Sequence, residues 1–156
     1  MKSNAKLLHG KRNLYVGWSG SHLSYEVRLY QVINSQDMEV EVKEWNATLH
    51  ENDLQIKEVE FETRQFNIDD QYKIKVISSG VGEEEPKEGR FTVVSDKEDP
   101  LSKNPEIRKQ LFHLQASWLA KQGNYGEWQF EAYQKLGNNK NYLAEAVRFG
   151  LSLGVQ

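Results

Sequence analysis

The chain has 156 residues, with 20 basic and 23 acidic side chains, a net charge of −3, four His and no Cys. The absence of Cys excludes disulfide scaffolds, thiolate metal sites and cysteine nucleophiles. The slightly acidic balance gives no general attraction to nucleic acid or anionic lipid. No apolar run is long enough to span a membrane and the N-terminus lacks the apolar core of a signal peptide. We therefore expect a soluble, cytoplasmic protein with no nucleic-acid or membrane partner.

Residues 13–95 show the period-two alternation of strands with one buried face. Residues 1–12 form an N-terminal arm in which no strand is evident. The first predicted strand covers residues 14–18, and the Trp18-Ser19-Gly20-Ser21 run that ends it reads as a hairpin turn. In the strand at 39–43, Val40 and Val42 are expected to face inward. The other predicted strands lie at 25–30, 54–61 with a polar break, 72–76 and 91–94.

Residues 105–156 carry Leu, Ala, Trp and Gln at helical spacing, after a polar linker at 96–104. Asn104, followed by Pro105, is typical of a helix start. The spacing predicts a helix from there to Gly123, a second at 127–136 and a third at 142–151. Strands followed by helices predict a segregated α+β protein, an antiparallel sandwich with a three-helix C-terminal cap. Three short helices cannot bury all of their large apolar side chains, which include Trp118, Trp128 and Phe130. The helices are therefore expected to dock on the strands.

Residues 13–95 resemble a fibronectin type III or related immunoglobulin-like sandwich. The resemblance rests on Trp18 in one predicted strand, on the next strand at 25–29, and on the run at 66–76. It implies that Tyr72 is the buried tyrosine of a tyrosine corner, with its hydroxyl bonded to backbone near residues 66–69. The family's usual first strand is not evident in residues 1–12, and residues 31–65 form a longer stretch than usual.

Residues 119–136 are similar to one tetratricopeptide repeat, through the Gly123-Asn124-Tyr125 turn and the ending Tyr133-Gln134-Lys135. Trp128 stands where that family has a small Ala, and no second copy follows at a 34-residue period. The helices are therefore expected to form a packed cap rather than a peptide-binding groove.

No set of residues with catalytic or metal-binding spacing stands out, so we expect a non-enzymatic protein without a cofactor or metal. The His residues are scattered over four different segments, and none pairs with another at metal-ligand spacing: His9, His22, His50 and His113.

Three features are candidates for partner binding. Without a strand in residues 1–12, the predicted strand at 14–18 would have an open edge, and Tyr15 is its outward-facing residue. Glu83, Glu84 and Glu85 make an acidic loop that suits a basic partner. Trp45 is expected to be exposed among polar neighbours, where it could stack on a sugar. The sequence therefore predicts an interaction module that binds another protein, with a carbohydrate-binding sandwich as the alternative.

Overall fold

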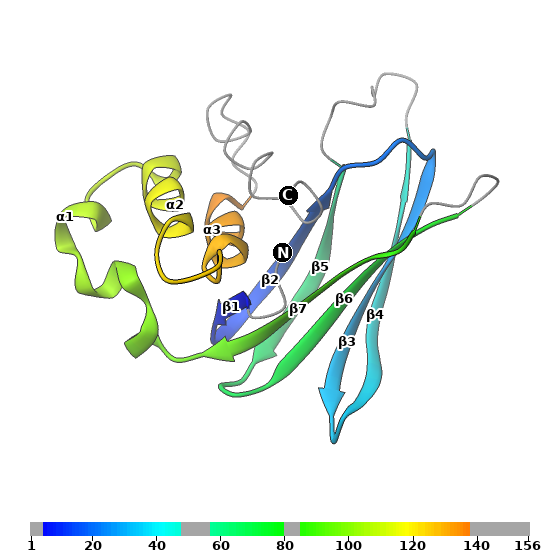
Figure 1. Cartoon of the computed structure of the whole chain (residues 1–156), viewed down its shortest axis with the longest axis horizontal. Coiled ribbons are helices and arrows are strands. Elements are labelled where there is room, and N and C mark those ends of the chain that lie inside the picture. Colours follow the sequence, from blue (N-terminus) through cyan, green and yellow to red (C-terminus); the bar gives the residue numbers. More distant parts are fainter. Residues whose placement is uncertain (1–4, 48–56, 80–84, 138–156) are drawn as a thin grey trace.

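The structure, a computed structural model, describes residues 5–47, 57–79 and 85–137 (Figure 1). These residues form strands first and helices second, as the sequence predicts. The strands are β1 (Ala5–Leu8), β2 (Gly10–Trp18), β3 (Ser24–Ile33), β4 (Gln36–Asn46), β5 (Lys57–Phe66), β6 (Gln71–Ser78) and β7 (Lys87–Val94). Two 3-10 helices, η1 (Asp96–Glu98) and η2 (Pro100–Lys103), precede α1 (Pro105–Arg108), α2 (Phe112–Ala120) and α3 (Gln129–Leu136). The helix predicted at 142–151 lies outside the described residues.

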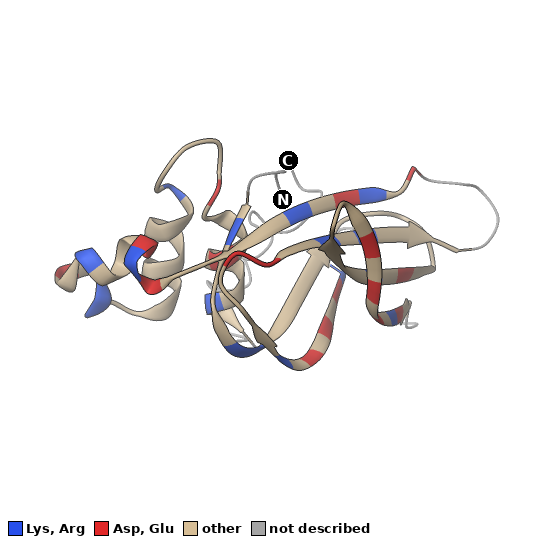
Figure 2. Ribbon diagram, turned by 90° about the horizontal axis from the view of Figure 1, so that it is seen from below, with Lys and Arg blue, Asp and Glu red and all other residues tan. Residues whose placement is uncertain are grey.

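The strands form two sheets, a five-stranded sheet in the order β1-β7-β6-β3-β4 and a two-stranded sheet of β2 and β5. Buried residues of both sheets meet in one apolar cluster, which includes Trp18, Leu29, Phe61 and Phe91. The face of the five-stranded sheet that meets this cluster is called its inner face below. Acidic and basic residues interleave along the strands (Figure 2), and the ion pairs of Arg28 with Glu26 and of Lys73 with Asp37 lie on the opposite, outer face.

The expectation of a purely antiparallel arrangement is wrong at one strand. Residues 5–8, part of the N-terminal arm in which the sequence shows no evident strand, form β1 and pair in parallel with β7. Ala5 and Leu7 are almost fully buried on this strand. The sequence signal is weak because a four-residue strand with Lys at its second position offers little alternation to detect.

The run at Ser19–Ser21 is also not a hairpin turn, because β2 pairs with β5 whereas β3 pairs with β4 and β6. The chain crosses here from one sheet to the other. The tight hairpin lies instead between β3 and β4, where Ile33 is paired with Gln36 and the turn residues Asn34 and Ser35 have φ of 52° and 65°. Two central residues with positive φ are typical of the turns that join twisted antiparallel strands.

The helices dock on the strands, as expected from their aromatic content. Phe130 of α3 belongs to the main apolar cluster, and its ring lies 5.1 Å from that of Phe91. Trp128 and Leu136 form a second cluster with Leu8 and Val94 at the ends of β1 and β7. The helical and strand regions therefore share their cores.

The helix predicted from Asn104 to Gly123 is divided in two. Leu111 has an extended backbone, with φ −64° and ψ 153°, between α1 and α2. The side-chain amide of Gln115 donates to the carbonyls of Arg108 and Gln110, which lie at the end of α1 and just after it. This local bonding favours the break. Leu111 and Phe112, at the break, are 67% and 64% exposed.

Candidate functional site

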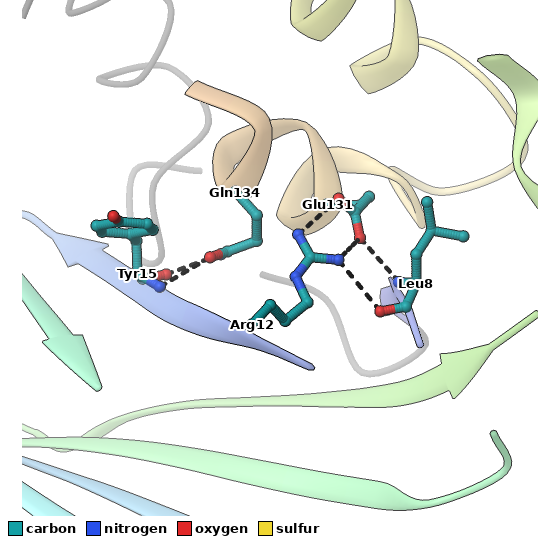
Figure 3. A network of polar contacts seen from close by, with 5 residues as sticks. All are labelled: Leu8, Arg12, Tyr15, Glu131 and Gln134. Atoms are coloured by element: carbon teal, nitrogen blue, oxygen red, sulfur yellow. Dashed lines mark hydrogen bonds and ion pairs between the residues drawn. The ribbon is translucent and has the colours of Figure 1, made fainter. Parts of the chain in front are cut away.

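The edge of β2 that was predicted to be open is closed by α3 (Figure 3). The carboxamide of Gln134 accepts a hydrogen bond from the Tyr15 N–H (2.7 Å) and donates one to the Tyr15 carbonyl (2.8 Å). A carboxamide carries the same donor and acceptor as a peptide group. Gln134 thus makes the two bonds that a neighbouring strand would make, and the prediction of an open edge at Tyr15 is wrong.

The edge of β1 is closed by the same helix. The fully buried carboxylate of Glu131 accepts the Leu8 N–H at 2.8 Å and holds both terminal nitrogens of Arg12, at 2.7 and 2.9 Å. Arg12 also donates to the Leu8 carbonyl, and the Lys6 N–H donates to the carbonyl of Glu127, just before α3. A buried carboxylate needs this number of donors to offset its lost hydration.

The outer edge of β5 is met by side chains of β4. The Glu41 carboxylate accepts the Glu62 N–H at 3.2 Å and forms an ion pair with Arg64. Lys43 lies 3.6 Å from carboxylate oxygens of both Glu41 and Glu62. Glu41 and Lys43 therefore face the two-stranded sheet.

This arrangement turns Val42 outward and leaves Val40 exposed at a bulge, whereas the sequence predicts that both face inward. Val42 is paired with Arg28 on the outer face, and the β3–β4 register skips Val40 at a bulge. Both side chains are exposed, Val40 at 36% and Val42 at 38%. The alternating run of Glu and Val allowed either face to be inward, and the charged partners on β5 decided which one is.

The distal part of β4 has an open backbone edge. The carbonyl of Ser24, at the start of β3, accepts a hydrogen bond from the Ser79 N–H, on the β6 side. Successive residues of an antiparallel strand direct their peptide groups to opposite neighbours, so Tyr30 and Val32 also direct theirs toward β6. Their partners on β4, Glu39 and Asp37, therefore direct their own peptide groups away from β3. Within the part of the chain that the structure describes, those outward N–H and C=O groups have no hydrogen-bond partner.

We call residues Gln36–Val40 of β4 the hairpin edge. All of its side chains are exposed, and the hairpin projects beside the other strands at the lower right of Figure 1. Met38 is 49% exposed and is paired with Gln31, which is itself paired with the buried Tyr72, so Met38 lies on the inner face. On the outer face, Asp37 is bonded to Lys73 at 2.8 Å, and this hydrogen bond lowers the pKa of Asp37.

A hollow of about 540 Å³ adjoins the hairpin edge. It is lined by the end of β3, the β3–β4 turn and the β5–β6 turn: Gln31, Val32, Ile33, Asn34, Ser35, Asp69, Asp70 and Gln71. Ile33 and the neighbouring Ile68 are 46% and 45% exposed. The carboxylates of Asp69 and Asp70 form no hydrogen bond or ion pair within the described residues. The hollow therefore combines apolar surface with two free negative charges.

The candidate residues chosen from the sequence are not brought together. Tyr15 lies on β2 under α3, whereas Glu85 lies exposed before β7; Glu83 and Glu84 are outside the described residues. Trp45 is half-buried rather than exposed, since its ring contacts those of Trp18 and Tyr25, and the Lys57 ammonium lies 5.2 Å from it. Sequence reasoning missed the hairpin edge and the hollow, for which the adjacent Asp69-Asp70 pair was the available signal.

Tyr72 is buried as expected, but its surroundings differ from a tyrosine corner. Its ring stacks on Phe91 at 5.2 Å and meets Phe66 edge-on at 5.1 Å. Its hydroxyl makes no hydrogen bond to residues 66–69, all of which the structure describes. Burial raises the pKa of Tyr72, and the charge of Asp70 raises it further.

Across residues 5–47, 57–79 and 85–137, no three His, Asp or Glu side chains are grouped so that they could hold a metal ion. His9 lies 3.3 Å from Asp96, and the ring of His22 packs against Tyr25. His50 is outside these ranges. None of the described helices is both long and apolar enough to cross a membrane.

Comparison of the chain with models of known protein families finds no match, and comparison with curated proteins finds none either.

Proposed function

We propose that the protein is a non-catalytic interaction module that accepts an extended segment of another protein along the hairpin edge of β4. The observation that carries this proposal is the outward direction of the Asp37 and Glu39 peptide groups on an exposed strand. Free N–H and C=O groups on a sheet edge are the usual template for strand addition. We also propose that the two sheets are a variant of the immunoglobulin-like sandwich, in which β1 joins β7 in parallel.

The other sheet edges support this choice by contrast. The side chains of Glu131 and Gln134 on α3 accept hydrogen bonds from backbone N–H groups of β1 and β2. On β5, the Glu41 side chain accepts the backbone N–H of Glu62. An added strand at any of these edges would have to displace buried or charge-assisted bonds first. At the hairpin edge, the outward peptide groups of Asp37 and Glu39 have no partner among the described residues that an added strand would have to displace.

The experiment is a selection of peptides from a random display library, with the intact protein as bait. The selection is repeated with two variants. Glu39→Pro removes an outward N–H group without removing a hydrogen bond between β3 and β4. Glu39→Thr is the matched control, because it keeps the N–H group and Thr favours strands. We expect peptides that bind the protein and Glu39→Thr but lose at least tenfold in affinity for Glu39→Pro.

Amide hydrogen exchange on the unsubstituted protein gives a second measurement that does not depend on the Pro variant folding. Selected peptides should slow exchange at the Asp37 and Glu39 amides. Peptides that bind Glu39→Pro equally well and leave those amides unchanged would contradict the proposal, as would a selection that yields no binding peptide.

A further inference from the structure

We infer that the protein has a second interaction surface, which binds lipid membranes that carry anionic headgroups. The surface is the segment from the end of α1 to the start of α2, residues 108–112, which we call the α1–α2 tip. It lies at the end of the molecule far from the hairpin edge of β4 (Figure 1) and does not depend on the proposed function.

The α1–α2 tip presents large apolar side chains to solvent. All five of its residues are exposed, with Leu111 at 67% and Phe112 at 64%. Exposed apolar side chains that lie together typically mark an interaction site. Residues next to each other in sequence do not share a helix face, so Leu111 and Phe112 form no stripe for a partner helix to cover. A fluid lipid surface does not require such a stripe.

The charge of the tip is positive. Residues 103–112 carry three basic side chains, Lys103, Arg108 and Lys109, and one acidic side chain, Glu106. Within the part of the chain that the structure describes, the three cations form no ion pair or side-chain hydrogen bond. The expectation of no membrane partner came from the charge of the whole chain, −3, which does not represent this end of the molecule.

Two of the acidic side chains that precede the tip are bonded elsewhere. Glu98 lies 3.2 Å from the ammonium of Lys6 on β1. The carboxylate of Asp99 accepts the backbone N–H of Leu101 at 2.9 Å, at the start of η2. These acids therefore already have partners of their own, and the cations of the tip are left to attract an external anion.

Hydrogen bonds hold the backbone of the tip in place. The side-chain amide of Gln115 donates to the carbonyls of Arg108 and Gln110, at 3.1 and 2.8 Å. The Leu111 carbonyl accepts the backbone N–H groups of Leu114 and Gln115, both at 3.0 Å. Because the tip is already ordered, binding does not have to fix its backbone, which lowers the entropic cost of association.

An anionic lipid surface matches both features of the tip. Membrane binding of this kind depends on the apolar area that enters the headgroup region and on the attraction of basic side chains to anionic lipid. Each Lys or Arg near such a surface raises binding about fivefold. A nucleic acid would also attract the cations, but it would leave Leu111 and Phe112 in water.

The test is co-sedimentation of the intact protein with vesicles at low ionic strength. We expect binding to vesicles of equal parts phosphatidylserine and phosphatidylcholine to exceed binding to pure phosphatidylcholine at least tenfold. Arg108→Gln/Lys109→Gln should lower binding to the mixed vesicles at least tenfold, because both basic contributions are lost. Leu111→Ser/Phe112→Ser should also lower it at least tenfold, because two apolar side chains no longer enter the surface.

Matched controls place the same changes on the strands and their connections. Lys11→Gln/Arg90→Gln removes two exposed cations, and Leu23→Ser/Ile68→Ser removes apolar side chains that are 76% and 45% exposed. Both controls should bind mixed vesicles as the unchanged protein does. Equal loss in the controls would mean that binding follows overall charge or apolarity, and this would overturn the inference.

A fluorescent label gives a second measurement that does not depend on loss of binding. The chain has no Cys, so a polarity-sensitive dye can be attached to Gln110→Cys in the tip or to Gln36→Cys at the hairpin edge. Mixed vesicles should shift the emission of the dye at position 110 to shorter wavelength and leave that at position 36 unchanged. Absence of binding to mixed vesicles, equal binding to pure phosphatidylcholine, or an unchanged emission at position 110 would overturn the inference.

Discussion

The two sides of the five-stranded sheet end differently. At the β1 side, Glu131 and Gln134 of α3 bond peptide groups of β1 and neighbouring β2. At the β4 side, the outward peptide groups of the hairpin edge have no partner among the described residues, and α1–α3 lie on the other side of the molecule (Figure 1). The difference shows what the appended helices contribute. In the described residues they complete the packing of the strands at the β1 side, through Phe130 in one apolar cluster and Trp128 and Leu136 in the other.

The largest effect is expected from removing the carboxylate that closes β1. Glu131→Ala leaves Arg12 without its anion and Leu8 without its acceptor. Breaking such a buried pair from one side should lower the free energy of unfolding by about 3–5 kcal/mol. Urea unfolding measures this loss, and Glu98→Gln is the control, because its ion pair with Lys6 is exposed and should contribute less than about 1 kcal/mol. A loss no larger than the control's would mean that α3 does not close β1.

A smaller loss is expected at the β2 edge. Gln134→Leu keeps an apolar side chain of similar size but removes both bonds to the Tyr15 peptide groups. Loss of two partly buried hydrogen bonds should cost about 2 kcal/mol in the free energy of unfolding. Gln134→Glu retains an acceptor for the Tyr15 N–H but sets a buried carboxylate oxygen against the Tyr15 carbonyl, so it should be at least as destabilising as Gln134→Leu. If the Leu variant is as stable as the unchanged protein, the amide does not act as a substitute strand.

The contact between α3 and the start of β5 predicts a dependence on alkaline pH. Tyr133 is buried and its hydroxyl donates to Glu58; burial raises the pKa of Tyr133. The unfolded chain then loses this proton near pH 10 while the folded protein retains it. Stability should be complete below that pH and fall above it, by about 1.4 kcal/mol per pH unit for this one group.

The measurement is urea unfolding of the protein and of Tyr133→Phe between pH 9 and pH 11. The Phe variant should show a shallower decline above pH 10, and the difference between the two isolates Tyr133 from the other Tyr and Lys residues. Parallel curves would show that Tyr133 titrates alike in the folded and unfolded states.

The smallest effect is expected at Tyr72. Because its hydroxyl does not bond residues 66–69, Tyr72→Phe should change the free energy of unfolding by less than about 0.5 kcal/mol. A tyrosine corner would instead predict a loss of roughly 1–2 kcal/mol. A loss in that range in urea unfolding would restore the corner assignment.

The order of strands and helices was predictable because long alternating runs at β3 and β6 carry a strong periodic signal. Which face of β4 points inward was not predictable, because the alternation of Glu41, Val42 and Lys43 is compatible with either the Val or the charged side chains facing inward. Only the position of Glu62 and Arg64 on β5 makes the charged face the inner one. β1 was not predicted because a run of four residues is too short to show a clear alternation of apolar and polar side chains.

The candidate site was predictable only in outline. An open edge available to a partner strand was expected, but at Tyr15 rather than on β4. Locating it required knowing that Gln134, more than a hundred residues away in the chain, reaches the Tyr15 peptide groups. No local pattern encodes such a contact, since Gln at a helical position is ordinarily a solvent-facing residue.

Residue-resolved amide hydrogen exchange of the intact protein tests the contrast between the two edges most directly. We predict strong protection at Leu8 and Tyr15, and at Met38, which faces β3. Asp37 and Glu39, on either side of Met38, should exchange at least a hundredfold faster, because their N–H groups face solvent. Protection of Asp37 and Glu39 equal to that of Met38, or rapid exchange at Tyr15, would contradict the account of a closed β2 edge and an open β4 edge.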